Sequence, residues 1–467
     1  MTTNKPKVAL INPPLPEGVS SHPFFAPLGL AYMAAVLDQK GYEVRIYDCP
    51  VSGINQEKLK SELASYQPDI VGFGSFTSTI NSALQSARAA KEVCPNARVL
   101  MGGVHASFAD KEILAQEAAV DIIVRGEGEE TIVELAEQWP QMQKLGDVKG
   151  ITFRKDNEIH QTPKRPLIRD LDALPLPAYK LLPVEKYRVT GRRLLPMITS
   201  RGCSFACSFC VASKMFGACL RTRSAENVLH ELEWLKNEWG AEGISFQDDT
   251  FTLDKQRTMA ICDGMIEKKL NLPWGCGTRT DTVTKEVLAK MRKAGCNEVA
   301  YGVDAGAQKI RDAFHKGVST QQCEKAIKWA KEEGIFVTTS VILGYPGETR
   351  ETLQESLDFI RKVEPDEVWL CHATPFPGTE LREIVIKNGW KMEPDWKIYN
   401  TMNPIFEDPA LPSKEIAQMR KDFYNKFYGP KYIMRQAVKG YFKGNLYSKI
   451  MTRTATNYML WRAKARL

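Results

Sequence analysis

The sequence predicts an α/β protein with two parallel-sheet units and a helical end region. Short β-branched runs alternate with helical patterns in two series, prolines cluster between the series, and basic residues accumulate near the end of the chain. We therefore expect a doubly wound parallel sheet over residues 1–145, a proline-rich linker over 146–194, a partial (β/α)6 barrel over 195–400 and a helical basic region over 401–467.

The composition is that of a globular protein with a substantial core. The chain has 467 residues, of which 43% are hydrophobic and 25% charged, enough for two or three domains. No apolar run reaches the ~18 residues of a membrane span, and the first one, residues 8–12, is far too short for the apolar region of a signal peptide. Eleven cysteines suit a reducing compartment, so we expect a cytoplasmic protein.

The first unit should contain five parallel strands. Suitable apolar runs, each followed by a helical stretch, occupy residues 8–11, 44–48, 69–73, 98–101 and 121–125. Ligands of such sheets bind beyond the carboxyl ends of the strands. The loops there are rich in glycine and small hydroxyls that would admit a large flat ligand, and the candidate contacts are Ser75, Thr77, Ser78, Gly102, Gly103, Gly126, Glu127 and Gly128. Tight βα turns also need glycine, so the pattern alone leaves both explanations open.

The second series follows a stretch with five prolines between residues 151 and 195, which excludes a regular helix or a central strand there. Six strand-like runs then alternate with helices, at residues 195–199, 243–246, 273–277, 298–302, 336–343 and 367–371. Six βα units predict a partial parallel barrel, whose functional site lies at the carboxyl ends of its strands.

The most informative motif is the set Cys203, Cys207 and Cys210, which follows the first barrel run at CxxxCxxC spacing. Three thiolates can hold three irons of a [4Fe-4S] cluster and leave the fourth iron open to a second molecule. A structural zinc site would need a fourth ligand at a defined distance, and Cys219 has no paired spacing. A disulfide framework is typical of short secreted chains and fits less well still.

This cysteine spacing resembles that of the radical-SAM superfamily. The resemblance implies that the amino and carboxylate groups of S-adenosylmethionine chelate the open iron, and that an electron from the cluster cleaves the molecule to a 5'-deoxyadenosyl radical. It also implies that the three cysteines are both the metal ligands and the catalytic centre.

The ends of the later barrel strands resemble the segments that bind S-adenosylmethionine in this superfamily. The resemblance assigns Asp248 and Asp249 to the methionine amino group and Arg279 to the methionine carboxylate. It assigns Asp304 to the ribose, although the family's usual Gly-x-Glu-Ser-Gly reads Gly-Val-Asp-Ala-Gly in this chain.

Gly344 and Pro346 fall in a run that looks like the family segment lying along adenine. These strand-end residues also have structural alternatives. Asp248 could be a helix N-cap, Arg279 could be paired with Asp281, and the glycine–proline run could be a simple strand-ending turn.

Two loops of the first unit, Gly102-Gly-Val-His105 and Gly126-Glu-Gly-Glu129, look like those of the cobalamin-binding domain that precedes many radical-SAM barrels. The resemblance implies bound cobalamin and a flavodoxin-like sheet of the B12-binding type. Corrinoid domains of the methionine-synthase type carry Asp-x-His-x-x-Gly after the first strand, whereas this chain has Asn12-Pro-Pro-Leu-Pro-Glu-Gly18. We therefore expect no histidine ligand of that kind, and we do not assign His105 to cobalt.

Together these features look like a cobalamin-binding-domain radical-SAM enzyme, similar to class B methyltransferases and to the anaerobic Mg-protoporphyrin cyclase. The implied reaction is hydrogen abstraction from an unactivated C–H bond and methyl transfer from cobalamin, with 5'-deoxyadenosine and S-adenosylhomocysteine as products. An oxidative cyclase or C–C coupling enzyme on a lipid- or tetrapyrrole-like substrate would release only the first product. A non-catalytic iron–sulfur electron carrier would need no S-adenosylmethionine pocket, and the strand-end residues argue against it.

The end region is the basic part of the chain, with 13 Lys and Arg against two Asp and Glu in residues 411–467. Lys431, Arg435, Lys439 and Lys443 recur on one helix face beside apolar residues, which suits peripheral contact with an anionic membrane, although solvated basic faces are common. No nucleic-acid module is present, so we expect no such partner. The other expected partners are a small-molecule or lipid-like substrate and an electron donor of the flavodoxin or ferredoxin type.

Overall fold

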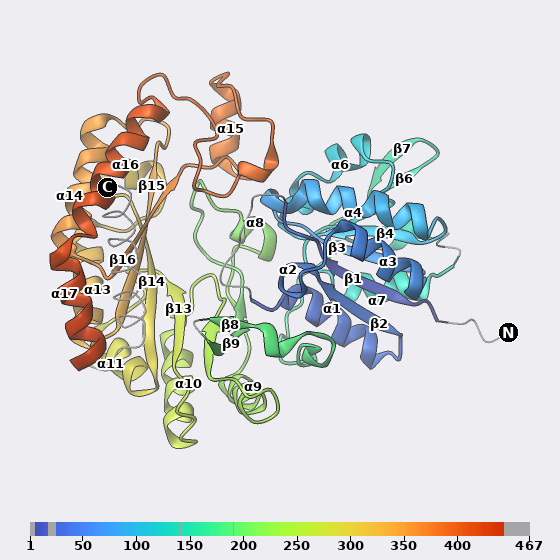
Figure 1. The fold of residues 1–467 in the computed structure, drawn as a ribbon, viewed down its shortest axis with the longest axis horizontal. Helices are drawn as coiled ribbons and strands as arrows, with labels where there is room; N and C mark the ends of the chain where they lie inside the picture. The colour runs from blue at the N-terminus through green and yellow to red at the C-terminus, as the bar shows by residue number, and fades with distance from the viewer. Residues whose placement is uncertain (1–4, 17–24, 141, 143, 190, 443–467) are drawn as a thin grey trace, which may run out of the picture.

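The structure, a computed structural model, describes residues 5–16, 25–140, 142, 144–189 and 191–442. It has two lobes, each built on a seven-stranded sheet (Figure 1). The segment that carries the three cysteines passes between the lobes, around the short helix α8 (Ala212–Phe216).

The first lobe is a doubly wound sheet with strand order β2-β1-β3-β4-β5-β6-β7. Its first five strands are parallel, as predicted: β1 (Val8–Asn12), β2 (Val44–Asp48), β3 (Ile70–Gly74), β4 (Arg98–Gly102) and β5 (Ile122–Val124). Most of their side chains are buried, on both faces, because the sheet lies between two helical layers, whereas Arg45 and Arg98 are exposed. The helices are α1 (Leu28–Gln39), α2 (Cys49–Ser52), α3 (Gln56–Tyr66), α4 (Ile80–Val93), α5 (Val104–Phe108), α6 (Asp110–Gln116) and α7 (Glu129–Glu137).

The sheet continues into residues that the prolines led us to assign to the linker. β6 (Ile151–Lys155) pairs antiparallel with β5, and β7 (Glu158–Gln161) pairs antiparallel with β6. The hairpin turn at Asp156 and Asn157 uses positive φ angles of 51° and 64°, which these two residue types tolerate. Residues 151–161 therefore belong to the first sheet, contrary to the prediction of a linker from residue 146.

The second lobe is a partial barrel with the six predicted parallel strands. They are β9 (Arg192–Met197), β12 (Gly243–Phe246), β13 (Trp274–Thr278), β14 (Cys296–Asp304), β15 (Phe336–Leu343) and β16 (Glu367–His372). The two-residue strand β8 (Arg188–Val189) adds an antiparallel edge beside β9.

Six barrel helices begin directly after a Ser, Thr or Asp residue whose side chain accepts a hydrogen bond from a backbone N–H group in the first helical turn. The capped helices are α9 (Ala225–Asn237), α10 (Lys255–Glu267), α11 (Lys285–Lys293), α13 (Thr320–Glu332), α14 (Arg350–Val363) and α15 (Glu380–Lys387). A shorter helix, α12 (Gln308–Ala313), precedes α13.

The rest of the linker bonds to both lobes. The Tyr187 hydroxyl donates to Asp48 Oδ2 of β2 at 2.6 Å, and the Tyr179 hydroxyl donates to the carbonyl of Pro196 in β9 at 2.9 Å. The linker is therefore part of the interface between the two sheets.

Two helices of the end region, α16 (Ser413–Phe427) and α17 (Pro430–Ala437), cover the outer edge of the barrel (Figure 1). The N–H groups of Val368 and Leu370 in β16 donate to the hydroxyls of Tyr428 and Tyr424 at 3.0 and 2.9 Å. An edge strand otherwise leaves such groups unpaired.

The basic stripe of the end region contacts acidic residues just before β16. Three ion pairs form: Lys431 and Arg435 with Glu364 at 3.1 Å each, and Lys439 with Asp366 at 2.6 Å. Lys443 lies outside the described residues. In the described ranges, no helix combines the length and the apolar character needed to cross a membrane.

The turn after β15 is held by a buried carboxyl group. The N–H group of Gly344 donates to Oε2 of Glu348 at 2.5 Å, and Glu348 is only 1% exposed. Burial raises the pKa of Glu348 to about 8, although the backbone N–H groups of Gly344 and Tyr345 act in the opposite direction. The carboxyl group is therefore largely protonated at neutral pH.

Glu348→Gln should remove a pH dependence of stability. The folded carboxyl titrates near pH 8 and an unfolded glutamate near 4.5, so the folded chain binds more protons between these values and its free energy of unfolding falls as the pH rises. Between pH 5 and pH 8 the wild type should lose roughly 2–4 kcal/mol relative to the variant. Urea unfolding of the cofactor-free chain at both pH values measures this difference, and equal losses in the two proteins would contradict it.

Candidate active site

The cysteine loop, residues 202–220, extends from a short antiparallel ribbon. The ribbon consists of β10 (Ser200–Arg201) and β11 (Arg221–Thr222). Gly202 begins the loop with φ +87°, and a Cβ atom there would lie 2.3 Å from the carbonyl oxygen of Cys219. This close backbone approach explains the glycine before Cys203.

Asp248 attaches the ribbon to the barrel. Its buried carboxylate accepts hydrogen bonds from the Thr199 hydroxyl at 2.8 Å, the Thr199 N–H group at 3.2 Å and the Ser200 hydroxyl. Burial raises the pKa of Asp248, and these donors act in the opposite direction. Asp249, in contrast, is exposed, and its carboxylate accepts a hydrogen bond from the N–H group of Gly202. Of the two predicted contacts to the methionine amino group, Asp249 thus keeps the accessible side chain.

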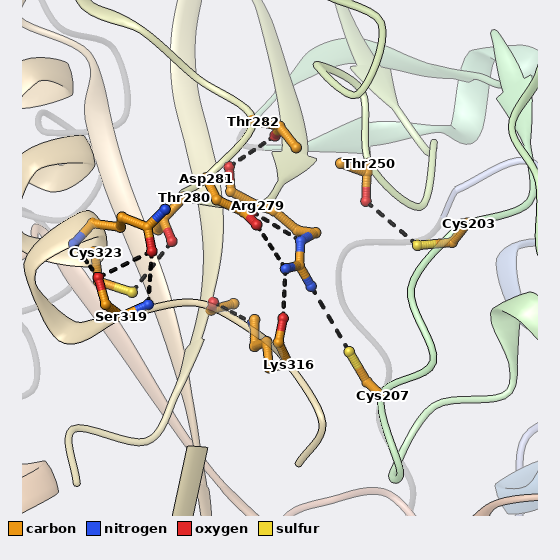
Figure 2. A network of polar contacts seen from close by, with 12 residues as sticks. Cys203, Cys207, Thr250, Arg279, Thr280, Asp281, Thr282, Lys316, Ser319 and Cys323 are labelled. Atoms are coloured by element: carbon orange, nitrogen blue, oxygen red, sulfur yellow. Dashed lines mark hydrogen bonds and ion pairs between the residues drawn. The ribbon is translucent and has the colours of Figure 1, made fainter. Parts of the chain in front are cut away.

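The three thiols of the loop are free and lie close to polar groups, and Figure 2 shows those of Cys203 and Cys207. Each sulfur has a neighbour: Cys203 has Thr250 Oγ1 at 4.0 Å, Cys207 has Arg279 Nη1 at 3.9 Å, and Cys210 accepts the Ala212 N–H at 3.4 Å. Burial raises the pKa of the Cys207 thiol, whereas the cations Lys316 and Arg279 act in the opposite direction and favour its thiolate.

This donor set fits a [4Fe-4S] cluster. Within the described ranges, no group of three or more His, Cys, Asp or Glu side chains could hold a single metal ion. A cluster has a different requirement, because each thiolate binds its own iron and the sulfurs need not meet at one point. The N–H groups directed at Cys207 and Cys210 are the kind of contact that tunes a bound cluster.

Arg279 is held beside the cysteine loop by Asp281 (Figure 2). Nε and Nη2 donate to the two carboxylate oxygens of Asp281 at 2.9 and 2.8 Å, and Nη2 also donates to the carbonyl of Lys316 at 2.8 Å. The guanidinium lies 3.4 Å from the ring centroid of Phe205 in the loop. The structure therefore contains the alternative pair with Asp281, and the contact to a methionine carboxylate stays a prediction.

Asp304, the predicted ribose contact, is paired with Lys316. Both side chains are buried, and the Lys316 ammonium also donates to the carbonyl of Gly302 at 2.6 Å. Lys316 was missed in the sequence because it lies in a loop without a recognisable motif. For Asp304 to bind a hydroxyl group, the Lys316 ammonium would have to move away, or the carboxylate would have to accept from both groups.

The concave face of the barrel borders a partly open cavity of about 440 Å³. The cavity exists because several residues of β13 and β14 that face it are small. Alternate residues of the neighbouring strands line it with polar groups, as expected for one face of a sheet. The lining includes Gln247, Asp248, Gly275, Gly277, Glu298, Ala300, Gly302, Thr338, Ser340 and Trp369. Gly344 and Pro346, the predicted adenine contacts, lie in the turn after β15 and outside this lining.

The predicted cobalamin loops form a surface of small residues at the end of the first sheet. Gly103 has φ +94°, and a Cβ atom there would lie 2.5 Å from the carbonyl oxygen of Ser75. The Ser75 hydroxyl donates to the carbonyl of Gly102 at 2.8 Å, which joins the two loops. A Cβ atom at Gly126 would meet no atom within 4 Å, so the surface is open there. These loops therefore fit a large ligand that approaches the backbone.

A turn, η1 (Thr77–Thr79), borders this surface and includes the half-buried Ser78. Thr77 Oγ1 lies 3.2 Å from Nδ1 of His105, and burial lowers the pKa of His105 to about 4. His105 is thus a buried, neutral residue that contacts Thr77. Phe76 is 67% exposed at the same strand end, and sequence reasoning missed it because exposure cannot be read from one aromatic residue.

The carboxylates after β5 contact the cysteine ribbon. Glu127, a predicted cobalamin contact, accepts hydrogen bonds from Arg201 and Arg221 at 2.9 Å each, and Glu129 accepts one from Arg201 at 2.5 Å. Gly128 packs against Met33. The carboxylate of Glu127 is therefore already occupied by two arginines.

Comparisons with known proteins agree with both lobes. A family model described as the radical SAM superfamily matches residues 197–360, and one described as the B12 binding domain matches residues 18–136. An uncharacterized methyltransferase of Pyrococcus horikoshii is 34% identical over 86% of this chain and 87% of its own length. The anaerobic magnesium-protoporphyrin IX monomethyl ester cyclase of Cereibacter sphaeroides is 32% identical over 89% of this chain and 69% of its own length.

The solved structures include a similar fold. The radical S-adenosylmethionine methyltransferase TsrM from Kitasatospora setae, with cobalamin and a [4Fe-4S] cluster bound, superposes with a TM-score of 0.74 at 16% identity. The match covers 98% of this chain and 100% of TsrM. The predicted fold, a B12-binding sheet followed by a radical-SAM barrel, is confirmed. Its domains imply a [4Fe-4S] cluster, S-adenosylmethionine and cobalamin as cofactors, and the chain belongs to the radical-SAM enzymes that carry a cobalamin-binding domain.

Proposed function

We propose that the protein is a cobalamin-dependent C-methyltransferase that acts on an unactivated C–H bond of a small-molecule or lipid-like substrate. The observation that carries the proposal is the contact between the two cofactor regions. The loop after β5 pairs with Arg201, two residues before Cys203, so the B12-binding lobe adjoins the cysteine loop. The similarity to a Pyrococcus horikoshii protein named as a methyltransferase supports the same function.

The residues divide the work in this proposal. Cys203, Cys207 and Cys210 hold the cluster, and the bound cofactors supply reductive cleavage of S-adenosylmethionine and the methyl group. Asp248 fixes the start of the cysteine loop, and Asp249 remains accessible beside it. The barrel cavity receives the reacting groups.

An oxidative cyclase or C–C coupling reaction is the second candidate, favoured by the similarity to the Cereibacter sphaeroides cyclase. The two reactions differ in their products, because methyl transfer releases S-adenosylhomocysteine in addition to 5'-deoxyadenosine. In either case we propose a cytoplasmic enzyme with an electron donor of the flavodoxin or ferredoxin type. The exposed Met434 of α17 and the exposed Val438 directly after this helix support peripheral contact of this region with an anionic membrane.

Replacing any one cluster cysteine, as in Cys203→Ser, Cys207→Ser or Cys210→Ser, should abolish cleavage of S-adenosylmethionine because an iron ligand is lost. Cys219→Ser is the matched control, since Cys219 is exposed in the same loop but outside the motif. Iron content and 5'-deoxyadenosine formation with dithionite, after anaerobic reconstitution, measure the effect.

The same preparation, loaded with hydroxocobalamin, tests methyl transfer. Formation of S-adenosylhomocysteine is expected, whereas 5'-deoxyadenosine alone would favour the coupling reaction. Loss of the cluster in Cys219→Ser would point instead to a four-cysteine electron carrier.

Arg279→Gln should shift the midpoint potential of the reconstituted cluster to a more negative value. The guanidinium charge and Nη1 lie beside Cys207, where they favour the more negative reduced cluster. Cleavage of S-adenosylmethionine should slow by about 10- to 100-fold, the range for residues that support metal ligands. A redox titration followed by electron paramagnetic resonance measures the shift, with Arg292→Gln at the end of α11 as control. An unchanged potential would contradict this influence of Arg279 on the cluster.

A further inference from the structure

Two like charges face each other on the ribbon that carries the cysteine loop. Arg201 and Arg221 are directly opposite in the antiparallel register of β10 and β11, so their side chains lie on one face. Both side chains are nearly buried, at 10% and 8% exposed. Like charges in this position destabilise a strand pair, and burial strengthens their repulsion. The ribbon therefore depends on negative charge from elsewhere.

That negative charge comes from the first lobe. Oε1 of Glu127 lies 2.9 Å from Nη1 of Arg201 and 2.9 Å from Nη1 of Arg221, and Glu129 accepts from Nη2 of Arg201 at 2.5 Å. The two carboxylates are 3% and 7% exposed. Two buried carboxylates thus neutralise two buried guanidiniums across the lobe interface, and we call these four residues the interlobe clamp.

The linker completes the clamp through its backbone. The N–H group of Ile168 donates to Glu127 at 2.9 Å, and its carbonyl accepts from Arg221 at 2.5 Å. Three separate segments therefore meet at one carboxylate, that of Glu127.

The clamp carboxylates alternate with the glycines of the predicted cobalamin loop. Gly126 borders open space, whereas Glu127 is directed at the ribbon. The same short loop borders the open surface and contacts the ribbon. A ligand on that surface that orders the loop backbone therefore also fixes the clamp carboxylates. We propose that the interlobe clamp couples occupancy of the cobalamin site to order in the cysteine loop. The identity of that ligand rests on the proposed function.

Coupling of this kind is reciprocal, so the cluster should also tighten cobalamin binding. The test is the affinity of the full chain for hydroxocobalamin, measured anaerobically with and without the reconstituted cluster. We expect binding to be about fivefold tighter or more with the cluster, the lower end of typical coupling between sites. Hydroxocobalamin should also slow hydrogen exchange of the amides in residues 200–222.

The variant Glu127→Gln/Glu129→Gln removes both charges with little change in volume, and the ratio of the two affinities should fall to near one. Glu130→Gln is the matched control, because Glu130 is the next residue of α7, is 57% exposed and pairs with Arg165 of the linker. A wild-type ratio retained in the double variant would overturn the proposal. If the double variant does not fold, unchanged exchange of residues 200–222 in the loaded wild type would overturn it equally.

These measurements need no turnover, so they separate the clamp from the proposed reaction. Coupled binding without S-adenosylhomocysteine formation would contradict the proposed methyl transfer but not the clamp. S-adenosylhomocysteine formation without coupled binding would contradict the coupling by the clamp but not the proposed reaction.

Discussion

Paired buried charges, rather than regular secondary structure, hold the cysteine loop in position. The ribbon beneath the loop has two residues in each strand, too few to fix it by backbone hydrogen bonds alone. Asp248 and the interlobe clamp hold the ribbon. Arg279, which is paired with Asp281, contacts Cys207 and Phe205 in the loop itself. Because an unpaired buried charge is costly, a loop held this way has few alternative positions.

The two sheets supply different chemistry to the interface that they share. The first sheet ends in glycines and small hydroxyls that expose backbone, while the barrel ends in carboxylates, a lysine and arginines that are already bonded to one another. The segment Gly126–Glu129 belongs to both, since its backbone borders the open surface and its carboxylates reach the ribbon. A change in the backbone of this segment on the first lobe would therefore also move the carboxylates that bond to the ribbon of the second lobe.

The sequence allowed the strands, the barrel and the cysteine motif to be predicted, because periodicity and spacing are local properties of the chain. The β6–β7 hairpin was hidden by the prolines that follow it, which marked the whole stretch as a linker. The partners of Glu127 and Asp304 were not predictable, since each forms its pair only through the tertiary fold. The pair of Arg279 with Asp281 was one of two alternatives, because the two residues are close in the sequence. Motif resemblance placed these residues near the site but did not reveal which charges they neutralise.

The tyrosine hydroxyls on β16 have a consequence for the solution behaviour of the molecule. An open barrel ends in a strand whose amide groups can recruit a strand from another chain. With Tyr424 and Tyr428 seated on Leu370 and Val368, hydrogen-bonding positions on that outer margin are filled from within the same polypeptide. Helix α16 and Tyr428 directly after it therefore block extension of the sheet by another chain, and a shortened chain lacking them would offer a template for self-association.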